Sequence, residues 1–186
     1  RDRVTKDKGK YRFLTGTNVE KYCYKSVSYV GQDVVDEFRK DEKYYIGERI
    51  LIRETGSFLT VIYLNENIYC NRSLYSTLIT GKNFSVAYVV GILNSKAIQY
   101  YYQQKFKAET DLFPKIRIKQ AKLLPIPTAT MEQQNSIAVL VEEIIKLKRQ
   151  GDYINASKCE KRIDQIVYIL YGLNHDEIEI IENNSI

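Results

Sequence analysis

Short apolar segments separated by turn residues run through the first half of the sequence. They are rich in β-branched and aromatic residues, a composition that favours strands over helices. Glycine, asparagine and serine cluster at several of the breaks between them, where these residues favour turns. We expect strands at residues 22–30, 50–53, 58–63, 68–70 and 73–79.

The spacing of apolar positions changes to a helical period near residue 85. A helix is predicted over residues 85–93, where apolar residues recur about every three positions. Ser95 is a good N-cap for a second helix that continues to Phe106. All three prolines fall within residues 112–127, so this segment is expected to be extended or looped.

The last third of the chain has the clearest helical pattern. Residues 129–149 are apolar on one helix face, and a second amphipathic helix follows after a short break. Gly172 suits the position just after a helix, and Asn174 with Glu177 predicts a capping box for a last short helix. The first two helices are predicted to form an antiparallel hairpin.

We therefore expect an α+β fold with a mixed α/β domain at residues 1–127 and a helical connector at residues 128–186. The chain is 44% hydrophobic, which is ordinary for a globular protein. Its net charge of +5 is unevenly divided. The first part carries 22 basic and 13 acidic side chains, a balance of +9, and the second carries 6 and 10, a balance of −4. A basic body thus precedes an acidic tail.

The region after Glu66 is unusually poor in acid. No aspartate or glutamate occurs from Asn67 to Ala108, and residues 67–127 carry nine basic side chains against two acidic ones. Nucleic acids favour such a surface, because phosphates repel carboxylates and exchange their counterions for protein cations. The alternative is a solvated basic face without a ligand, and charge alone does not decide between the two.

Basic residues alternate with apolar ones near the prolines. If the segment is extended, Lys115, Arg117 and Lys119 share one face, while Phe113, Ile116 and Ile118 lie nearer the core. Such a stripe could follow a phosphate backbone. It could equally protect an edge strand from aggregation.

Tyrosine is strongly favoured over tryptophan, with sixteen of the former and none of the latter. Tyr100, Tyr101 and Tyr102 are consecutive on the second predicted helix, so they point about 100° apart and cannot all be buried. We expect Tyr101 in the core.

Cysteine and histidine content argues against several kinds of site. Three cysteines without a CxxC pair argue against a structural zinc site. They fit a reducing cytosol, so a cytoplasmic location is expected. The single histidine leaves little scope for a Ser-His-Asp triad. Asp33, Asp36 and Glu37 could be imagined as a nuclease cluster, which is the weakest of our hypotheses.

Familiar catalytic patterns are missing too. No GxGxxG, P-loop or HExxH pattern occurs. The tetrapeptide of amino-methyltransferases needs a Pro-Pro pair, which this sequence lacks. No run of 18 apolar residues predicts a membrane span. Because the sequence begins at Arg1, we expect it to be a piece of a longer protein.

Several short segments match one known family in order and spacing. They are residues 13–22 with 50–56, residues 91–98 with 123–127, and residues 133–137 with 163–173. Together they resemble the TaqI-like C-terminal specificity domain, the target-recognition part of bacterial restriction-modification DNA methyltransferases. The layout is also similar to the specificity subunit of type I systems. The resemblance covers the chain from about Tyr11 to Glu182.

The resemblance implies a sequence-specific reader of double-stranded DNA, in a type IIG-like enzyme or a type I-like assembly. This chain would be non-catalytic and hold no cofactor. Its partners would be DNA and a methyltransferase domain or subunit that uses S-adenosylmethionine, and also a nuclease that uses Mg²⁺ where one is present. No membrane partner is expected. The stretches 93–96 and 124–127 are expected to be structural, as a helix junction and a strand exit.

Side-chain chemistry selects the candidate DNA contacts. Arg and Lys can bond guanine, Asn and Gln can bond adenine, and Ser and Thr are adaptable. The candidates lie in loops in or near the acid-free region: Arg53, Thr55, Ser57, Arg72, Lys82, Asn83, Lys105, Lys107, Lys115 and Arg117. The competing hypothesis is a protein-interaction or oligomerisation module that uses the apolar stripe of the hairpin: Ile137, Leu140, Ile144, Ile163, Ile166 and Leu170.

Overall fold

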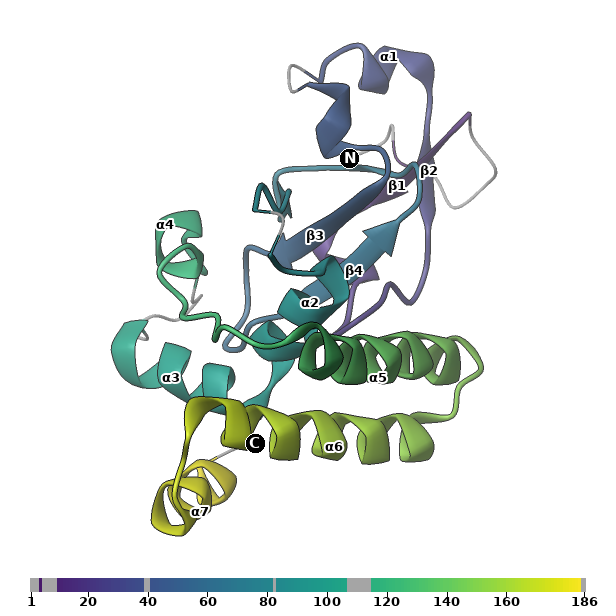
Figure 1. Ribbon diagram of the computed structural model, residues 1–186. Helices are drawn as coiled ribbons and strands as arrows, with labels where there is room; N and C mark the ends of the chain where they lie inside the picture. The colour runs from purple at the N-terminus through teal and green to yellow at the C-terminus, as the bar shows by residue number, and fades with distance from the viewer. Residues whose placement is uncertain (1–3, 5–9, 39–40, 82, 107–114, 185–186) are drawn as a thin grey trace.

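A computed structural model describes residues 4, 10–38, 41–81, 83–106 and 115–184, which form the expected α+β fold (Figure 1). The strands are β1 (Tyr11–Leu14), β2 (Ser28–Val30), β3 (Glu48–Arg53), β4 (Val61–Asn65), β5 (Tyr69–Cys70) and β6 (Leu74–Thr77). The helices are α1 (Gln32–Val35), α2 (Val86–Asn94), α3 (Lys96–Phe106), α4 (Ile118–Ala121), α5 (Met131–Arg149), α6 (Tyr153–Tyr171) and α7 (His175–Asn183). Short 3₁₀ turns cover Gly16–Asn18 and Glu42–Tyr44.

Two three-stranded sheets form the N-terminal part. One has the order β2-β1-β5, and the other has the antiparallel order β4-β3-β6. Alternation along the central strand β3 sends successive side chains to opposite faces. Leu51 joins an apolar cluster with Leu14 of the first sheet, whereas Ile50 and Ile52 join the cluster that contains α2. The β4-β3-β6 sheet is therefore covered on both faces.

Helix α2 lies at the centre of the molecule, and all nine of its residues are buried. The hairpin helix α5 crosses it at Gly91. A Cβ atom at Gly91 would lie 2.4 Å from Cγ2 of Ile137 and 3.2 Å from Cγ2 of Val141. Only glycine lets the two backbones approach this closely. The apolar core is continuous from α2 into the hairpin, and the domain division at residue 127 stays a prediction.

Two buried amides cover the outer edge of β4. Asn94 accepts a hydrogen bond from the Val61 N–H at 3.2 Å and donates to its carbonyl oxygen at 2.8 Å. Gln99 makes the same pair of bonds with Leu59, each of 3.0 Å. Together with the Tyr22 N–H, which donates to the same Val61 carbonyl oxygen at 2.9 Å, these side chains take the place of a neighbouring strand, so the edge backbone groups keep partners inside the core. The expectation that 93–96 marks a structural helix junction is confirmed.

The helical hairpin follows the predicted pattern, and its stripe of Ile137, Leu140, Val141, Ile144 and Ile145 is buried. Thr130 caps the first helix in a capping box with Gln133. Gly172 ends α6 with a φ of 66°, a value that glycine adopts without strain. The capping box of Asn174 and Glu177 is confirmed at the start of α7.

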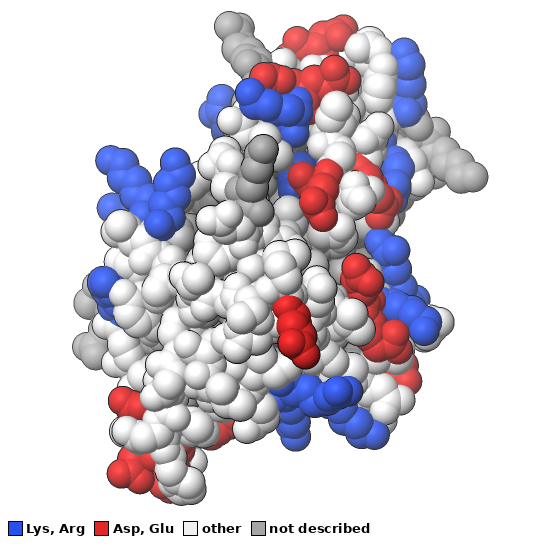
Figure 2. All heavy atoms as spheres, viewed as in Figure 1, with Lys and Arg blue, Asp and Glu red and all other residues white. Residues whose placement is uncertain are grey.

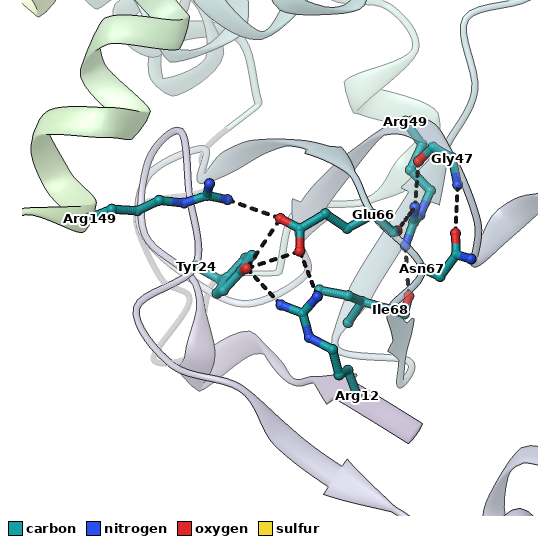
Figure 3. A network of polar contacts seen from close by, with 8 residues as sticks. All are labelled: Arg12, Tyr24, Gly47, Arg49, Glu66, Asn67, Ile68 and Arg149. Atoms are coloured by element: carbon teal, nitrogen blue, oxygen red, sulfur yellow. Dashed lines mark hydrogen bonds and ion pairs between the residues drawn. The ribbon is translucent and has the colours of Figure 1, made fainter. Parts of the chain in front are cut away.

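Glu66 ties the far end of the hairpin to the sheets (Figure 3). Its carboxylate accepts from Arg12 of β1 at 2.6 Å and from Arg149, the last residue of α5, at 3.0 Å. The Tyr24 hydroxyl donates to both carboxylate oxygens at 3.2 Å. Burial raises the pKa of Glu66, but the Arg12 hydrogen bond and charge outweigh it and leave the pKa below its usual value.

Arg49, also in Figure 3, is completely buried, and no carboxylate among the described residues pairs with it. Its guanidinium donates to the carbonyl oxygens of Gly47, Glu66 and Ile68, each at 2.7 Å. The Arg49 side chain thereby fixes the turn that carries Glu66, since three backbone groups depend on it.

The strand predictions need correction near the N-terminus. Strand β1 was not expected at all, and residues 22–27 do not form a regular strand. Tyr22 adopts a positive φ of 76° and makes only an isolated bridge to Ile62, so the regular strand begins at Ser28. The strands predicted at 50–53 and 73–79 are confirmed within one to two residues at most ends, whereas the one predicted at 58–63 begins and ends later.

The prediction for residues 112–127 is wrong in part, because α4 is a short helix between the prolines. The stretch 124–127 consequently follows a helix and is not a strand exit. The tyrosine expectation is wrong as well. Tyr102 is the buried member of the triplet at 5% exposure, and Tyr101 is only partly buried.

Candidate nucleic-acid interface

The loop that leaves β3 and the segment that precedes α4 lie side by side. Thr55 and Lys115 form an antiparallel bridge, and the Ile116 N–H donates to the Glu54 carbonyl oxygen at 2.7 Å. The Ile116 side chain is fully buried and anchors the segment. Polar residues that are distant in sequence are thereby collected at one end of the β4-β3-β6 sheet.

A basic ridge, which we define as Lys115, Arg117, Lys119 and Lys122, occupies this segment. All four residues are exposed, and no acidic residue lies between positions 112 and 131. The Arg117 N–H starts the α4 turn by donating to Oε1 of Gln120 at 3.2 Å. Figure 2 shows Lys and Arg side chains gathered over α4, with no acidic side chain among them. The ridge therefore presents concentrated positive charge on a short, anchored turn.

One acid, Glu54, lies at the edge of the ridge. The Tyr75 hydroxyl donates to its carboxylate at 3.2 Å. Burial, and then the charge of Glu54, raises the pKa of Tyr75, so this hydroxyl keeps its proton at neutral pH. The two other acids of the region, Glu109 and Asp111, lie outside the described residues.

The loop that leaves β3, which we call the β3 exit, carries further candidates, and they lie around the same end of the sheet. Arg53 is the last residue of β3 and is paired in register with Leu74. The Glu54 N–H donates to the Ser73 carbonyl oxygen at 2.9 Å, which brings the exposed Arg72 to this end. Ser57 is exposed in the loop between β3 and β4. The structure thus brings together Arg53, Thr55, Ser57, Arg72, Lys115 and Arg117.

The structure does not join every candidate to this group. Lys105 lies at the end of α3, where its Nζ donates to the Tyr101 hydroxyl at 2.5 Å. Asn83 lies beside the start of α5, because its carbonyl oxygen accepts from the side chain of Gln134 at 2.8 Å. Lys82 and Lys107 lie outside the described residues.

The choice of candidates from sequence omits Lys119 and Lys122, although both belong to the ridge. The expected stripe on an edge strand is wrong in part. Ile116 is buried as expected, but residues 118–121 are helical and Ile118 is 38% exposed instead of lying nearer the core. Phe113 lies outside the described residues. The acid-free composition of residues 112–131, read without assuming extension, is the signal that finds both lysines.

The residues of the competing interaction hypothesis lie mainly inside the chain. Ile137, Leu140, Ile144 and Ile163 are buried at 6% exposure or less. Ile166 and Leu170 are partly buried against the same core. Much of the apolar stripe is therefore used between the hairpin and α2.

Two further observations concern the described parts of the chain only. They contain no group of three or more His, Cys, Asp or Glu residues arranged to hold a metal ion. None of their helices is both long enough and apolar enough to cross a membrane.

Comparison with known proteins identifies a family and a number of solved structures of similar fold. The family described as the TaqI-like C-terminal specificity domain matches residues 11–126, which confirms the resemblance found in the sequence. A solved structure of the type IIL restriction-modification enzyme MmeI in complex with DNA aligns with a TM-score of 0.58 at 13% identity. The alignment covers 98% of this chain and 31% of that enzyme. No curated protein sequence matches significantly.

Proposed function

Because this chain belongs to the TaqI-like C-terminal specificity domain family, we propose that it recognises double-stranded DNA within a restriction-modification system. The observation that carries the proposal is the pairing of the β3 exit with the segment before α4, which sets the basic ridge beside a loop of polar side chains. The similarity in fold to MmeI, which was solved with DNA, supports the same conclusion.

The two parts of this surface suit different tasks. The ridge of Lys115, Arg117, Lys119 and Lys122 is dense in charge and exposed, which suits contacts to phosphates that position a protein on DNA. The more varied side chains in the loop after β3 and at Arg72 suit base edges. Arg53 and Arg72 can bond guanine, while Thr55 and Ser57 can adapt to several bases.

In this proposal the chain supplies no catalytic group. It positions a separate domain or subunit that binds S-adenosylmethionine and methylates a base, together with a Mg²⁺-dependent nuclease where the system has one. The alignment to only 31% of MmeI fits a module of a larger enzyme. The chain's own contribution is charge, shape and base-edge hydrogen bonds.

The test is salt-dependent binding of labelled duplex DNA, followed by fluorescence anisotropy. Each ridge residue that contacts a phosphate contributes about one unit to the slope of log affinity against log salt. We expect Lys119→Gln and Lys122→Gln each to reduce that slope by about one unit, in a similar way for unrelated duplexes.

Lys158→Gln is the matched control, because Lys158 is exposed on α6 and its Nζ donates to Asn155 within the same helix. The control should bind DNA as the unmodified chain does. An unchanged salt slope in both ridge variants, or the absence of duplex binding at low salt, would contradict the proposal.

A further inference from the structure

A cavity lies where α3, the end of α6 and α7 meet. Its volume is about 450 Å³, within the range of roughly 300–1,000 Å³ that is usual for binding sites. The walls are mainly apolar and aromatic. The lining residues that matter here are Tyr100, Tyr101, Tyr171, Ile180 and Glu177.

Hydrogen bonds to neighbouring residues hold the aromatic walls in place. The Tyr171 hydroxyl donates to the Pro125 carbonyl oxygen at 2.7 Å, and burial raises the pKa of this tyrosine. The Tyr101 hydroxyl accepts from Lys105, which lies over the Tyr101 ring at 5.0 Å. Both rings therefore present fixed apolar surface. At the opening, Ile180 is 49% exposed, which leaves part of a large apolar side chain in contact with solvent.

Helix α7 gives this opening a strongly negative rim. It carries Asp176, Glu177, Glu179 and Glu182, and neither lysine nor arginine occurs from residue 163 to the end of the sequence. Acidic side chains gather over α7 at the lower left of Figure 2.

These carboxylates differ in how far they are neutralised. Glu182 pairs with Lys96 and accepts from the Tyr168 hydroxyl. Glu177 accepts the Asn174 N–H at 2.9 Å in its capping box. Neither Glu177 nor Glu179 has an ion pair among residues 10–38, 41–81, 83–106 and 115–184. The rim thus keeps negative charge beside an open apolar cavity.

We propose that this cavity and the acidic rim bind a basic segment of another protein. One aromatic or large apolar side chain of that segment enters between Tyr100, Tyr101 and Tyr171, and its lysines or arginines lie along α7. Charge complementarity selects the partner, since the carboxylates attract cations and repel phosphates. Tyrosine faces favour the same choice, because they attract ammonium and guanidinium groups.

This surface is separate from the basic ridge, so the inference does not depend on DNA recognition. An apolar anchor in the cavity supplies most of the expected affinity, as buried anchors do at protein interfaces. The charges along the rim add rate and specificity, and their contribution decreases as salt increases.

The absence of tryptophan from the chain allows a direct test. The probe is a short peptide with one tryptophan between lysines, whose fluorescence can be excited selectively in the presence of the full chain. We expect saturable binding with a blue shift of tryptophan emission, which reports transfer into an apolar site. A peptide with glutamates in place of the lysines should bind at least about tenfold more weakly.

Two variants locate the site. Ile180→Glu should weaken peptide binding about tenfold or more, because it places charge at the apolar opening. Glu179→Lys should weaken it several-fold at low salt and less at high salt. Glu142→Lys is the matched control, because Glu142 is an exposed acid on α5 away from the cavity lining. Circular dichroism shows whether each variant keeps its helices.

Other outcomes overturn the inference. If the lysine and glutamate peptides bound equally well, the acidic rim would have no part in binding. If Ile180→Glu bound the peptide as the unmodified chain does, the cavity would not be the binding site. Dimerisation that Ile180→Glu abolishes, seen by sedimentation velocity, would make a second copy the occupant. If duplex DNA displaced the peptide, and if Glu179→Lys made that displacement stronger, this face would be assigned to DNA.

Discussion

At the junction between α2 and α5, a glycine and several side-chain amides lie inside the protein. The basic ridge instead exposes four cations on and beside the short helix α4. At the junction, Gly91 leaves no room for a side chain, and Asn94 completes the hydrogen bonds of a strand edge. The ridge is held by the buried Ile116 and Leu124, whereas its four charged side chains are exposed and form no ion pair within the described part of the chain. Substitutions should therefore change folding at the junction and ligand binding at the ridge.

Gly91 provides the largest expected effect. In Gly91→Val, the added Cβ alone would lie 2.4 Å from Cγ2 of Ile137, a methyl group on a β-branched side chain that a helix holds largely in one χ1 rotamer. We expect a loss of about 3 kcal/mol or more in the free energy of unfolding, measured by urea denaturation. Gly91→Ala should also destabilise the protein, although alanine usually favours helices by about 1 kcal/mol over glycine.

Gly81→Ala is the control for this contrast, because a Cβ there meets nothing within 4 Å. The double variant Gly91→Ala with Ile137→Ala should lose less stability than the sum of the single changes, since the second removes the clashing methyl group. If the stability losses of the two single variants simply added in the double variant, the close approach of α2 and α5 would not be the cause of the Gly91→Ala loss.

Asn94 comes next in size. Asn94→Ala leaves the Val61 N–H without its side-chain partner at a buried strand edge, while the Val61 carbonyl oxygen keeps the Tyr22 N–H at 2.9 Å. One unpaired buried group costs about 1–3 kcal/mol, so we expect a loss in that range in urea denaturation. Asn135→Ala, at an exposed position on α5, should change stability by less than about 0.5 kcal/mol. Similar losses in the two variants would argue against the edge role of Asn94.

The sequence predicts the junction better than the sheets. The helices α2, α3, α5, α6 and α7 follow from apolar periodicity, and several of their ends follow from Ser95, Gly172 and Asn174, because these signals are local. Strand β1 escapes prediction because its pairing with β2 and β5 depends on residues far along the chain. Tyr22 misleads for a similar reason, since tertiary contacts outweigh the strand preference of tyrosine.

The candidate site is predictable in composition but not in arrangement. The counts of basic and acidic residues indicate the region of the ridge. Side-chain chemistry selects Arg53, Thr55 and Arg72 as candidate DNA contacts. Neither shows that Thr55 lies against Lys115, since that pairing joins two loops through one isolated bridge. The apolar cavity beside α7 has no sequence signal beyond the charge of its acidic rim, because its walls come mainly from three separate helices.

Asp164 should give the junction between α6 and α3 a pH dependence. This buried carboxylate of α6 accepts the Lys96 N–H at the start of α3 at 2.8 Å. Burial raises its pKa to about 6, against the lowering effects of the Lys96 hydrogen bond and of the charges on Lys96 and Lys21, while Glu182 adds to the rise. The ordinary pKa of an unfolded aspartate is about 3.9.

The folded protein therefore binds this proton more tightly than the unfolded chain does. The contribution of Asp164 to stability is greatest below about pH 4, falls as the pH rises to about 6, and is level above that. Asp164→Asn keeps an oxygen acceptor for the Lys96 N–H and removes the titration. We expect the variant to gain about 2 kcal/mol relative to the unmodified chain at pH 7.5 and to lose that advantage near pH 4. If the difference in stability between the variant and the unmodified chain were constant from pH 4 to pH 7.5, titration of Asp164 would not be its cause.

The ridge should show the smallest effect on stability. Lys119 and Lys122 are exposed and have no ion pair within the described part of the chain, so their charges lie in solvent and repel one another. Lys119→Gln should change the free energy of unfolding by less than about 0.5 kcal/mol in urea denaturation, because surface substitutions without specific contacts have effects of this size. The same variant should reduce the salt slope of DNA binding, whereas Gly91→Ala, studied below its unfolding transition, should leave that slope unchanged. If Lys119→Gln destabilised the fold as much as Asn94→Ala does, the ridge would be part of the scaffold and its charges would need another explanation.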